Sequence, residues 1–373
     1  MNESKKRSAS SVSESLCALY AACGYTQYNM SKFEAYDLYV RNKDFLISDS
    51  VITFTDTNGQ LMALKPDVTL SIVKNNRDEA GVVQRLYYQE NVYRISKGSH
   101  CFRELPQTGL ECMGDLDAYC LFDVIRLACL SLREISENSV LDLSHLTPVK
   151  YVFDQLQLPK TVQNAMLKCI GEKNLHELRR LCSQYDVDET AAVQLETLVS
   201  CSGDAQSVLP QLQQVFTDTA CEKAFAQLQE MLAALQAEGL SDMVHLDFSV
   251  VSDMKYYNGF VFKGFVEHVP NSVLSGGQYD PLMRRMGRIS GAIGFAVYFD
   301  ELARLFDDTE PYDLDTLLLY DDSTTWQAVE QTMQSLRKTC ASVSAQRKQP
   351  AALRCRRVLK LENGEVTTVY EDA

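Results

Sequence analysis

The sequence predicts an α+β protein: an antiparallel sheet with flanking helices, a helical insertion and a small C-terminal α/β lobe. Three observations support this fold class. Residues 85–93 and 110–113 have strand character and are joined through a polar loop around residues 97–99, as in two antiparallel strands. Residues 147–240 are rich in Leu, Gln, Glu and Ala and repeat with helical spacing. After Pro311, roughly sixty residues remain, enough only for a small lobe.

These observations divide the chain into a tail, a body and a C-terminal domain. The polar first residues, 1–12, are expected to be a disordered tail. The body is predicted to span residues 13–306, with the insertion at about residues 147–240. The acidic stretch 307–311 ends in proline and serves as the linker to the domain at 312–373.

Composition narrows the classes of function. The chain has 373 residues, with 36 basic and 50 acidic side chains and a formal net charge of −14. Such a chain is a poor candidate for nucleic acid, because contacts to phosphate dominate that affinity. The 12 cysteines include no C-x-x-C pair, so free thiols in a reducing cytoplasm are expected rather than a metal site. No segment has the length and apolarity of a membrane span or the apolar core of a secretory signal.

A helix, a hairpin and a second helix are predicted before the central strands. The helix covers residues 13–23, with Ser13 as its N-cap and Gly24 as its stop. Asn58-Gly59 joins strands at 51–56 and 60–64. Asp67 and Thr69 then begin a helix at 70–75. Asp67 has two interpretations: it caps this helix, which is the commoner role, or it binds the ammonium of a ligand.

The strand that follows residue 101 carries the most informative polar residues. Because side chains alternate along a strand, Gln107, Gly109 and Glu111 lie on one face. Arg94 and Arg103 stand at the two ends of the polar loop. Two guanidinium groups, an amide and an inward carboxylate suit a small zwitterion. The alternative is a hairpin whose charges face water.

The remainder of the chain contributes further sheet and helix. Paired glycines at 276–277 indicate close approach of backbone or ligand. Lone histidines at 145 and 176 suit surface or capping roles. Arginines at 284, 285 and 288 form a small basic cluster. In the body, the predicted elements are a helix at 117–135, strands at 244–248, 256–262 and 263–269, and a strand-to-helix passage at 291–299 that continues as a helix at 300–306. In the lobe, they are a strand at 316–320, a helix at 325–340, a polar connection at 341–350 and a hairpin of 358–362 with 366–370.

Five separated motifs, which follow one another along the chain as they do in that family, resemble the catalytic body of histidyl-tRNA synthetase. This enzyme is a class II aminoacyl-tRNA synthetase with an antiparallel sheet. The resemblance covers roughly residues 13–306, including the position of the helical insertion. The matching segments are Arg94, residues 103–111 of motif 2, residues 64–69, the histidine-specific signature at 256–262 with 276–280, and the start of motif 3 at 294–296.

The sequence departs from the synthetase pattern at residues that handle ATP and the substrate carboxylate. Ser252 stands where the family has an arginine that activates the carboxylate, and Glu301 stands where motif 3 ends in an ATP-binding arginine. Ser96 and Ser31 replace an acidic residue of motif 2 and the proline of motif 1. Because adenylate formation needs cations at the transferring centre, this chemistry is expected to be absent.

A retained amino-acid pocket with lost ATP machinery resembles the regulatory subunits of ATP phosphoribosyltransferase. The resemblance implies a non-catalytic subunit without cofactor or metal, which activates the short catalytic subunit and senses histidine in histidine biosynthesis. It also implies a homodimer within a cytoplasmic hetero-oligomer. The family roles carried over are Asp67 and Thr69 for the ammonium, Gln107 with Arg94 or Arg103 for the carboxylate, Glu111 and Tyr257 for the imidazole nitrogens, and Tyr256 and Tyr279 as the walls of the slot.

Three functions therefore stay open. A regulatory subunit binds histidine without histidine-dependent exchange between ATP and pyrophosphate. A working synthetase catalyses that exchange. A paralogue that senses another small ligand neither binds histidine nor stimulates a short phosphoribosyltransferase.

Overall fold

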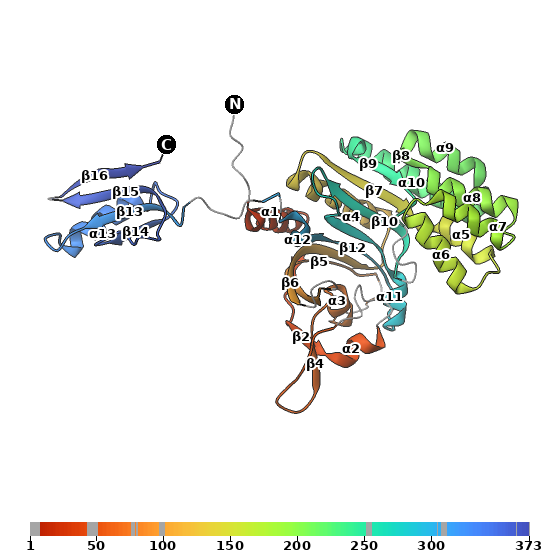
Figure 1. Cartoon of the computed structure of the whole chain (residues 1–373), viewed down its shortest axis with the longest axis horizontal. Coiled ribbons are helices and arrows are strands. Elements are labelled where there is room, and N and C mark those ends of the chain that lie inside the picture. Colours follow the sequence, from red (N-terminus) through yellow and green to blue (C-terminus); the bar gives the residue numbers. More distant parts are fainter. Residues whose placement is uncertain are drawn as a thin grey trace. The chain divides into compact units, whose positions relative to one another are not determined.

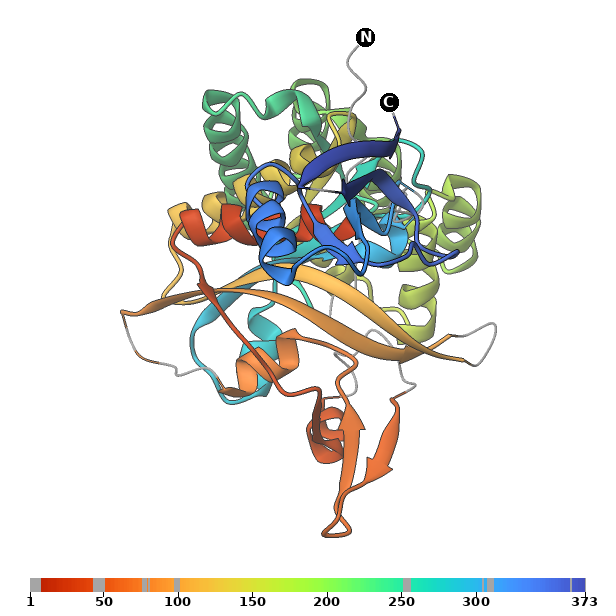
Figure 2. The same cartoon turned by 90° about the vertical axis from the view of Figure 1, so that its left-hand side faces the viewer.

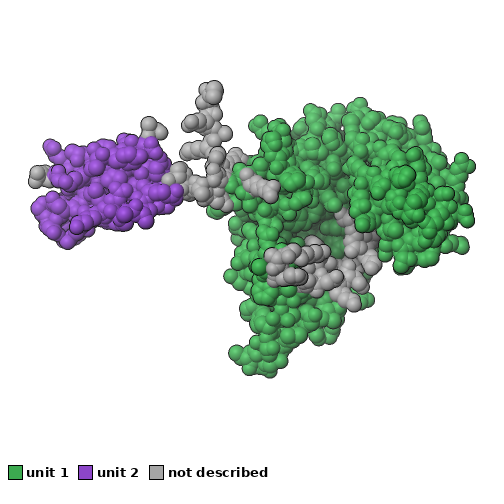
Figure 3. Space-filling model, viewed as in Figure 1, with its two compact units in different colours: residues 1–306 green, residues 307–373 purple. Residues whose placement is uncertain are grey.

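The computed structural model describes most of the chain as two compact units, Met1–Phe306 and Asp307–Ala373 (Figure 3). The described residues are 8–42, 51–75, 79, 81–96, 101–250, 256–303, 305–306, 312–362 and 364–372. Residues 1–7 of the predicted tail, the loop at 97–99, Ser252 and the predicted linker at 307–311 lie outside them.

The first helix, α1 (Ala9–Ala22), begins earlier than predicted, within the segment expected to be disordered. Ser8 caps it by accepting from the Ser11 amide, so the prediction of Ser13 as N-cap was wrong. Ser13 lies inside the helix, where its buried hydroxyl pairs with Thr108 Oγ1 at 2.6 Å. The prediction that Gly24 ends the helix is confirmed, since it adopts a φ of +84°.

The body is built on a mainly antiparallel nine-stranded sheet, as predicted. Within this sheet, only the pairs β1–β5 and β7–β9 are parallel among the described strands. Four of its strands, β1, β7, β8 and β11, were not expected from the sequence. In spatial order the strands are β1 (Thr26–Gln27), β5 (Val83–Ile95), β6 (Phe102–Gly114), β12 (Gly291–Tyr298), β11 (Leu274–Gln278), β10 (Asn258–Val266), β7 (Ser139–His145), β9 (Val244–Asp247) and β8 (Ser202–Asp204).

Helices cover the two faces of this sheet differently. On one face α1 and α4 (Ala118–Ile135) pack over the central strands, and their apolar residues form the larger core (Figure 1). The N-cap of α4 is Asp117, which confirms the helix predicted there. On the other face a smaller core forms with α2 (Tyr36–Arg41), α3 (Thr69–Asn75) and α11 (Asp280–Arg285). This second face leaves room for the cavity described below.

A small three-stranded sheet precedes α3, with β4 (Leu61–Leu64) between β2 (Phe33–Ala35) and β3 (Thr53–Thr55). The predicted hairpin is confirmed, and its turn projects from the body at the bottom of Figure 2. Asp56 closes the turn by accepting from the amides of Asn58 and Gln60, each at 2.8 Å.

The helical insertion is confirmed within the fully described stretch 101–250. His145 caps its first helix, because Nδ1 accepts from the Thr147 amide at 3.3 Å, and His176 is exposed, so both histidines have the expected kind of role. The insertion also contains β8 and a short 3₁₀ helix, Ser241–Met243, which were not predicted. The helices are α5 (Leu146–Gln155), α6 (Lys160–Gly171), α7 (Leu175–Gln184), α8 (Glu189–Ser200), α9 (Ala205–Val215) and α10 (Thr219–Ala237).

The second unit is a small α/β lobe whose strands follow the order β14-β13-β15-β16. The polar stretch 341–350 contains a strand, β14, so the prediction of a simple connection was wrong. Residues 343–346 form this strand because β13, which is distant in the sequence, supplies parallel backbone partners. The elements are β13 (Leu314–Tyr320), α13 (Trp326–Leu336), β14 (Val343–Gln346), β15 (Cys355–Glu362) and β16 (Glu365–Glu371).

Candidate functional site

The floor of the cavity is the face of the sheet that α1 and α4 leave uncovered. Registered pairing aligns residues of five adjacent strands into rows, and alternate residues of each strand share this face. Its centre carries glycine, alanine and serine, while larger polar groups stand at its edges. One row is Leu86, Glu111, Gly294, Gly277 and Val261, and the next is Tyr88, Gly109, Ala296, Ser275 and Lys263.

Two glycines of the floor are required by side chains from neighbouring strands. A Cβ on Gly294 would overlap Glu111 Oε2, and a Cβ on Gly109 would lie 2.5 Å from the hydroxyl of Tyr88. Glycine therefore creates the space that these polar groups occupy. The close approach predicted for Gly277 is also present, since a Cβ there would lie 2.9 Å from the Tyr257 ring.

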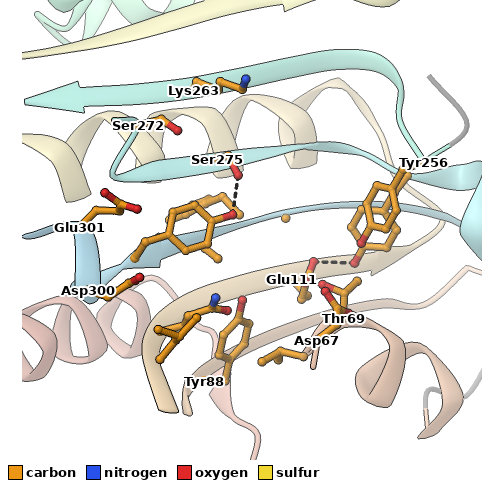
Figure 4. A pocket seen from close by; sticks show the side chains of 18 of the residues that line it. Asp67, Thr69, Tyr88, Glu111, Tyr256, Lys263, Ser272, Ser275, Asp300 and Glu301 are labelled. Carbon is orange, nitrogen blue, oxygen red and sulfur yellow. Dashed lines mark hydrogen bonds between the residues drawn. The ribbon is translucent and has the colours of Figure 1, made fainter. Parts of the chain in front are cut away.

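The resulting cavity has a volume of about 630 Å³, within the range of small-molecule sites. It is elongated, with two chemically distinct ends (Figure 4). The inner end is lined by Asp67, Thr69, Glu111, Tyr256 and Tyr279, and the outer end by Lys263, Ser272, Ser275, Tyr298, Asp300 and Glu301.

Glu111 is the central polar group of the inner end. It is 2% exposed and accepts from Thr69 Oγ1 at 2.7 Å and from the Tyr279 hydroxyl at 2.5 Å. Burial is the main cause that raises its pKa to about 8. The two hydroxyl donors act to lower the pKa, and the repulsion of Asp67 acts to raise it. Each carboxylate oxygen has a second lone pair, so Glu111 can accept a further hydrogen bond from a ligand.

Asp67 has the commoner of the two roles considered for it, helix capping, and it also lines the cavity. Its carboxylate caps α3 by accepting from the Leu70 amide at 2.9 Å, and the same side chain lines the cavity. Burial raises the pKa of Asp67, while the Leu70 amide and the charge of Arg94 act in the opposite direction. A ligand ammonium at this point would stabilise the ionised form.

Arg94 and Gln107 are further polar residues of the cavity lining. Arg94 lines the cavity and its Nε donates to the Pro66 carbonyl at 3.2 Å. Gln107 is only 5% exposed, and within the described residues its side-chain amide has no hydrogen-bond partner. Because buried polar groups are normally hydrogen-bonded, an amide without such a partner at a cavity wall can donate to and accept from a ligand.

Arg103 is the one predicted site residue that does not line the cavity. It is exposed, although it pairs with Arg94 across the two strands. Burial raises the pKa of Asp300, and the positive charge of Arg103 acts in the opposite direction. The structure therefore brings the other predicted residues together and leaves Arg103 at the rim.

Tyrosine rings close the inner end. Tyr256 lies with its ring centroid 4.5 Å from Tyr257 and 5.8 Å from Tyr279. The strand predicted at 256–262 begins later, because the register shifts after Asn258 and Gly259 adopts a φ of +65°. Burial raises the pKa of all three tyrosines, so their hydroxyls stay protonated and can donate.

The sequence did not identify most of the outer end. Ser275 and Tyr298 share a hydrogen bond of 2.6 Å, and Tyr88 completes the floor. Strand alternation combined with the correct register could have found them, but the register was not known. Glu301, noted as a departure from the synthetase pattern, does line this end and accepts from Asn271 Nδ2 at 2.9 Å.

Features of other classes of site are missing from the described part of the chain. It holds no group of three or more His, Cys, Asp or Glu side chains that could bind a metal ion. None of its helices combines the length and apolarity needed to cross a bilayer.

The family model described as histidyl-tRNA synthetase matches residues 1–302. The chain belongs to the histidyl-tRNA synthetase family. The predicted family and its class II fold are thus confirmed, and the cavity lies in the part of the chain that the family model covers.

Relatives within the histidyl-tRNA synthetase family carry a more specific name. A protein named ATP phosphoribosyltransferase regulatory subunit, from Oceanobacillus iheyensis, is 25% identical over 285 residues, covering 76% of this chain and 70% of the relative. A Bacillus halodurans structure described as an ATP phosphoribosyltransferase regulatory subunit/histidyl-tRNA synthetase has a TM-score of 0.76 at 23% identity, covering 90% of this chain and 88% of that one. A chain of the Thermotoga maritima ATP phosphoribosyl transferase (HisG:HisZ) complex has a TM-score of 0.61 at 16% identity, covering 77% and 96%.

Proposed function

We propose that this chain is a regulatory subunit of ATP phosphoribosyltransferase, which activates a short catalytic subunit and senses histidine at the first step of histidine biosynthesis. The names of the relatives support the regulatory role. The observation that carries histidine sensing is the inner end of the cavity, where a buried carboxylate and buried phenols face the space left by glycines.

Histidine would bind with its ammonium at Asp67 and at the lone pairs of Thr69, whose hydroxyl proton is already given to Glu111. Its carboxylate would lie at Arg94 and Gln107, which both line the cavity. A neutral imidazole has one donor and one acceptor nitrogen. Glu111 would accept from the donor nitrogen.

The other imidazole nitrogen needs a donor, which a protonated tyrosine provides. Tyr257 lines the same end of the cavity, and within the described residues no hydrogen bond engages its hydroxyl. Burial keeps this phenol protonated, because it raises the pKa of Tyr257. A carboxylate opposite a phenol would distinguish imidazole from an apolar ring.

We further propose that the subunit does not activate histidine with ATP. The outer end presents Asp300 and Glu301, so a triphosphate there would meet like charge. Within the described lining the cavity has two cations, Lys263 and Arg94, and the charge of Arg94 already acts on Asp300. Adenylate formation relies on several cations around the reacting phosphate, whereas the described lining carries two cations against four carboxyl groups.

The subunit would act as a homodimer within a cytoplasmic hetero-oligomer. Phe33 and Phe54 project from one face of the small sheet, 49% and 38% exposed, with ring centroids 5.7 Å apart. Exposed aromatic pairs of this kind mark surfaces that protein partners cover. All twelve cysteines lie within the described residues and are free, which suits a reducing compartment.

The test mixes the purified chain with a short-form catalytic subunit and measures phosphoribosyl transfer with and without histidine. The proposal expects stimulation by the chain and inhibition by histidine. Stimulation that histidine does not change would reject histidine sensing alone. No stimulation, with no histidine binding by calorimetry, would favour a paralogue that senses another ligand.

A second measurement addresses the synthetase alternative. Exchange of labelled pyrophosphate into ATP is followed with and without histidine. The proposal expects no histidine-dependent exchange, and its appearance would identify a working synthetase. For histidine to regulate the complex, it must bind one arrangement of the subunits better than another, so its affinity is expected to differ with and without the catalytic partner.

A further inference from the structure

The basic cluster at residues 284–288 separates into two kinds of arginine. Arg285 donates to the Arg41 carbonyl at 3.4 Å, and Arg288 donates to the Lys74 carbonyl at 3.1 Å, so both hold the ends of other helices. Arg284 is exposed, and no hydrogen bond or ion pair of its guanidinium is found within the described part of the chain. Its positive charge is therefore available.

Arg284 lines a second cavity of about 470 Å³. This cavity lies between the insertion, which contributes α5 and α10, and the body, which contributes β10, β11 and α11. Lys150 reaches it from α5 and likewise forms no ion pair within the described residues. Asp154, on the same helix, is the carboxylate of its lining, so two cations face one anion.

We infer that this second cavity is a binding site for a small oxyanion, the phosphoryl or carboxylate group of a metabolite. The chain has a net charge of −14, so a cavity with excess positive charge is unusual in it. Guanidinium and ammonium groups form the strong, charge-assisted hydrogen bonds that such anions accept. Polar neutral groups complete the lining, including Gln227 and Gln278.

His145, in the same wall, does not supply a third charge. It is 5% exposed, and burial lowers its pKa to about 4. Its Nδ1 accepts from the Thr147 amide, and its ring packs edge-on to Phe260 at 5.1 Å. At neutral pH it is an uncharged part of the wall, and anion binding depends on Arg284 and Lys150.

The anion site adjoins the amino-acid cavity through Tyr257, which lines both. Tyr257 also packs against a small apolar cluster of Leu146, Val250 and Val261. Leu146 is the first residue of α5, so this one side chain connects the amino-acid cavity to the insertion. If histidine binds as in the proposed function, on which this step rests, the anion and histidine change each other's affinity by the same factor.

Inorganic phosphate is the probe for the test. It is titrated calorimetrically into the full chain at constant ionic strength, with acetate titrated separately to distinguish a carboxylate from a phosphoryl ligand. Saturable binding is expected, weakened about tenfold or more by Arg284→Gln and by Lys150→Gln. Arg285→Gln makes the same charge change on the same helix and is the matched control, with an expected change of less than about twofold.

Absence of saturable binding of either anion, or an equal loss in the Arg285→Gln control, would overturn the site. Histidine is titrated into the same samples with and without phosphate, and phosphate with and without histidine. Each pair of titrations gives a ratio of the two dissociation constants, measured with and without the other ligand. Two equal ratios that differ from one support the connection through Tyr257, and ratios of one reject it. Phosphate binding without histidine binding would leave the anion site standing and remove the proposed histidine sensing.

Discussion

Replacing Glu111 by glutamine tests an acid of the cavity whose pKa burial raises. Its pKa in the folded protein is about 8, against an ordinary value of 4.5, because the side chain is buried. Between these two pH values the folded protein holds a proton that the unfolded chain releases. The stability of the ligand-free protein therefore falls as pH rises from about 4.5 to about 8, and the deficit is constant above that. At about 1.36 kcal/mol per pH unit, the deficit is on the order of 5 kcal/mol.

The neutral amide of Glu111→Gln removes this dependence and can still accept from one hydroxyl. The ligand-free variant is expected to exceed the wild type in free energy of unfolding by a few kcal/mol near pH 8, with the difference shrinking toward pH 5. Urea denaturation followed by circular dichroism across this range measures it. Glu104→Gln, an exposed position on the same strand, is the matched control. Parallel stability profiles for wild type and Glu111→Gln would refute the argument.

The same substitution should have the opposite effect on histidine. Loss of a charge-assisted hydrogen bond is expected to weaken binding about 10- to 100-fold. Because Glu111 must ionise to accept from the imidazole, wild-type affinity should rise about fivefold from pH 7 to pH 8, as the ionised fraction grows. Calorimetric titration measures both effects. A flat wild-type profile, or equal affinity in the variant, would contradict the assigned role.

Two further substitutions address other parts of the site, and a third addresses the ion pair of Lys65 with Glu90. Asp67→Asn keeps an oxygen that can cap α3 but loses the charge, so histidine affinity should fall about tenfold with little change in melting temperature; a matching loss of stability would favour a purely capping role. Gly294→Ala forces a methyl group onto the Glu111 carboxylate, so calorimetry should show no histidine binding, and wild-type affinity would show that the floor can yield. Lys65→Met leaves Glu90 without its buried partner, and urea denaturation should show a loss of about 3 kcal/mol, whereas a loss below about 1 kcal/mol would mean that water replaces the cation.

The sequence determined the class of fold and most of the inner end of the cavity. Alternation along β6 was enough to place Gln107, Gly109 and Glu111 on one face, because the side-chain period of a strand is local. The Asn58-Gly59 turn and the helix predicted over residues 117–135 were likewise correct. Each depends on residues within a few positions of one another, which is the range over which turn and capping chemistry act.

Other features depended on partners far away in the chain. Ser13 has the composition of an N-cap, but its partner is Thr108 on another element. The strand β14 exists because β13 lies beside it. The outer end of the cavity, with Tyr88 and Tyr298, follows from the register of strands that are distant in sequence. Register is a tertiary property, because the side chain opposite a given residue depends on which strand pairs with it and where.

The tertiary structure also decided which charges act together. From the sequence, Arg94 and Arg103 were equivalent candidates, and only the tertiary structure shows that Arg94 lines the cavity and that Arg103 is exposed outside its lining. The raised pKa of Glu111 follows from burial, which no spacing along the chain reveals. The sequence by itself thus determined which chemical groups are present and which strand face carries them. The packed sheet decided their neighbours, because electrostatic and hydrogen-bond energies depend on distance and exclusion of water, not on order along the chain.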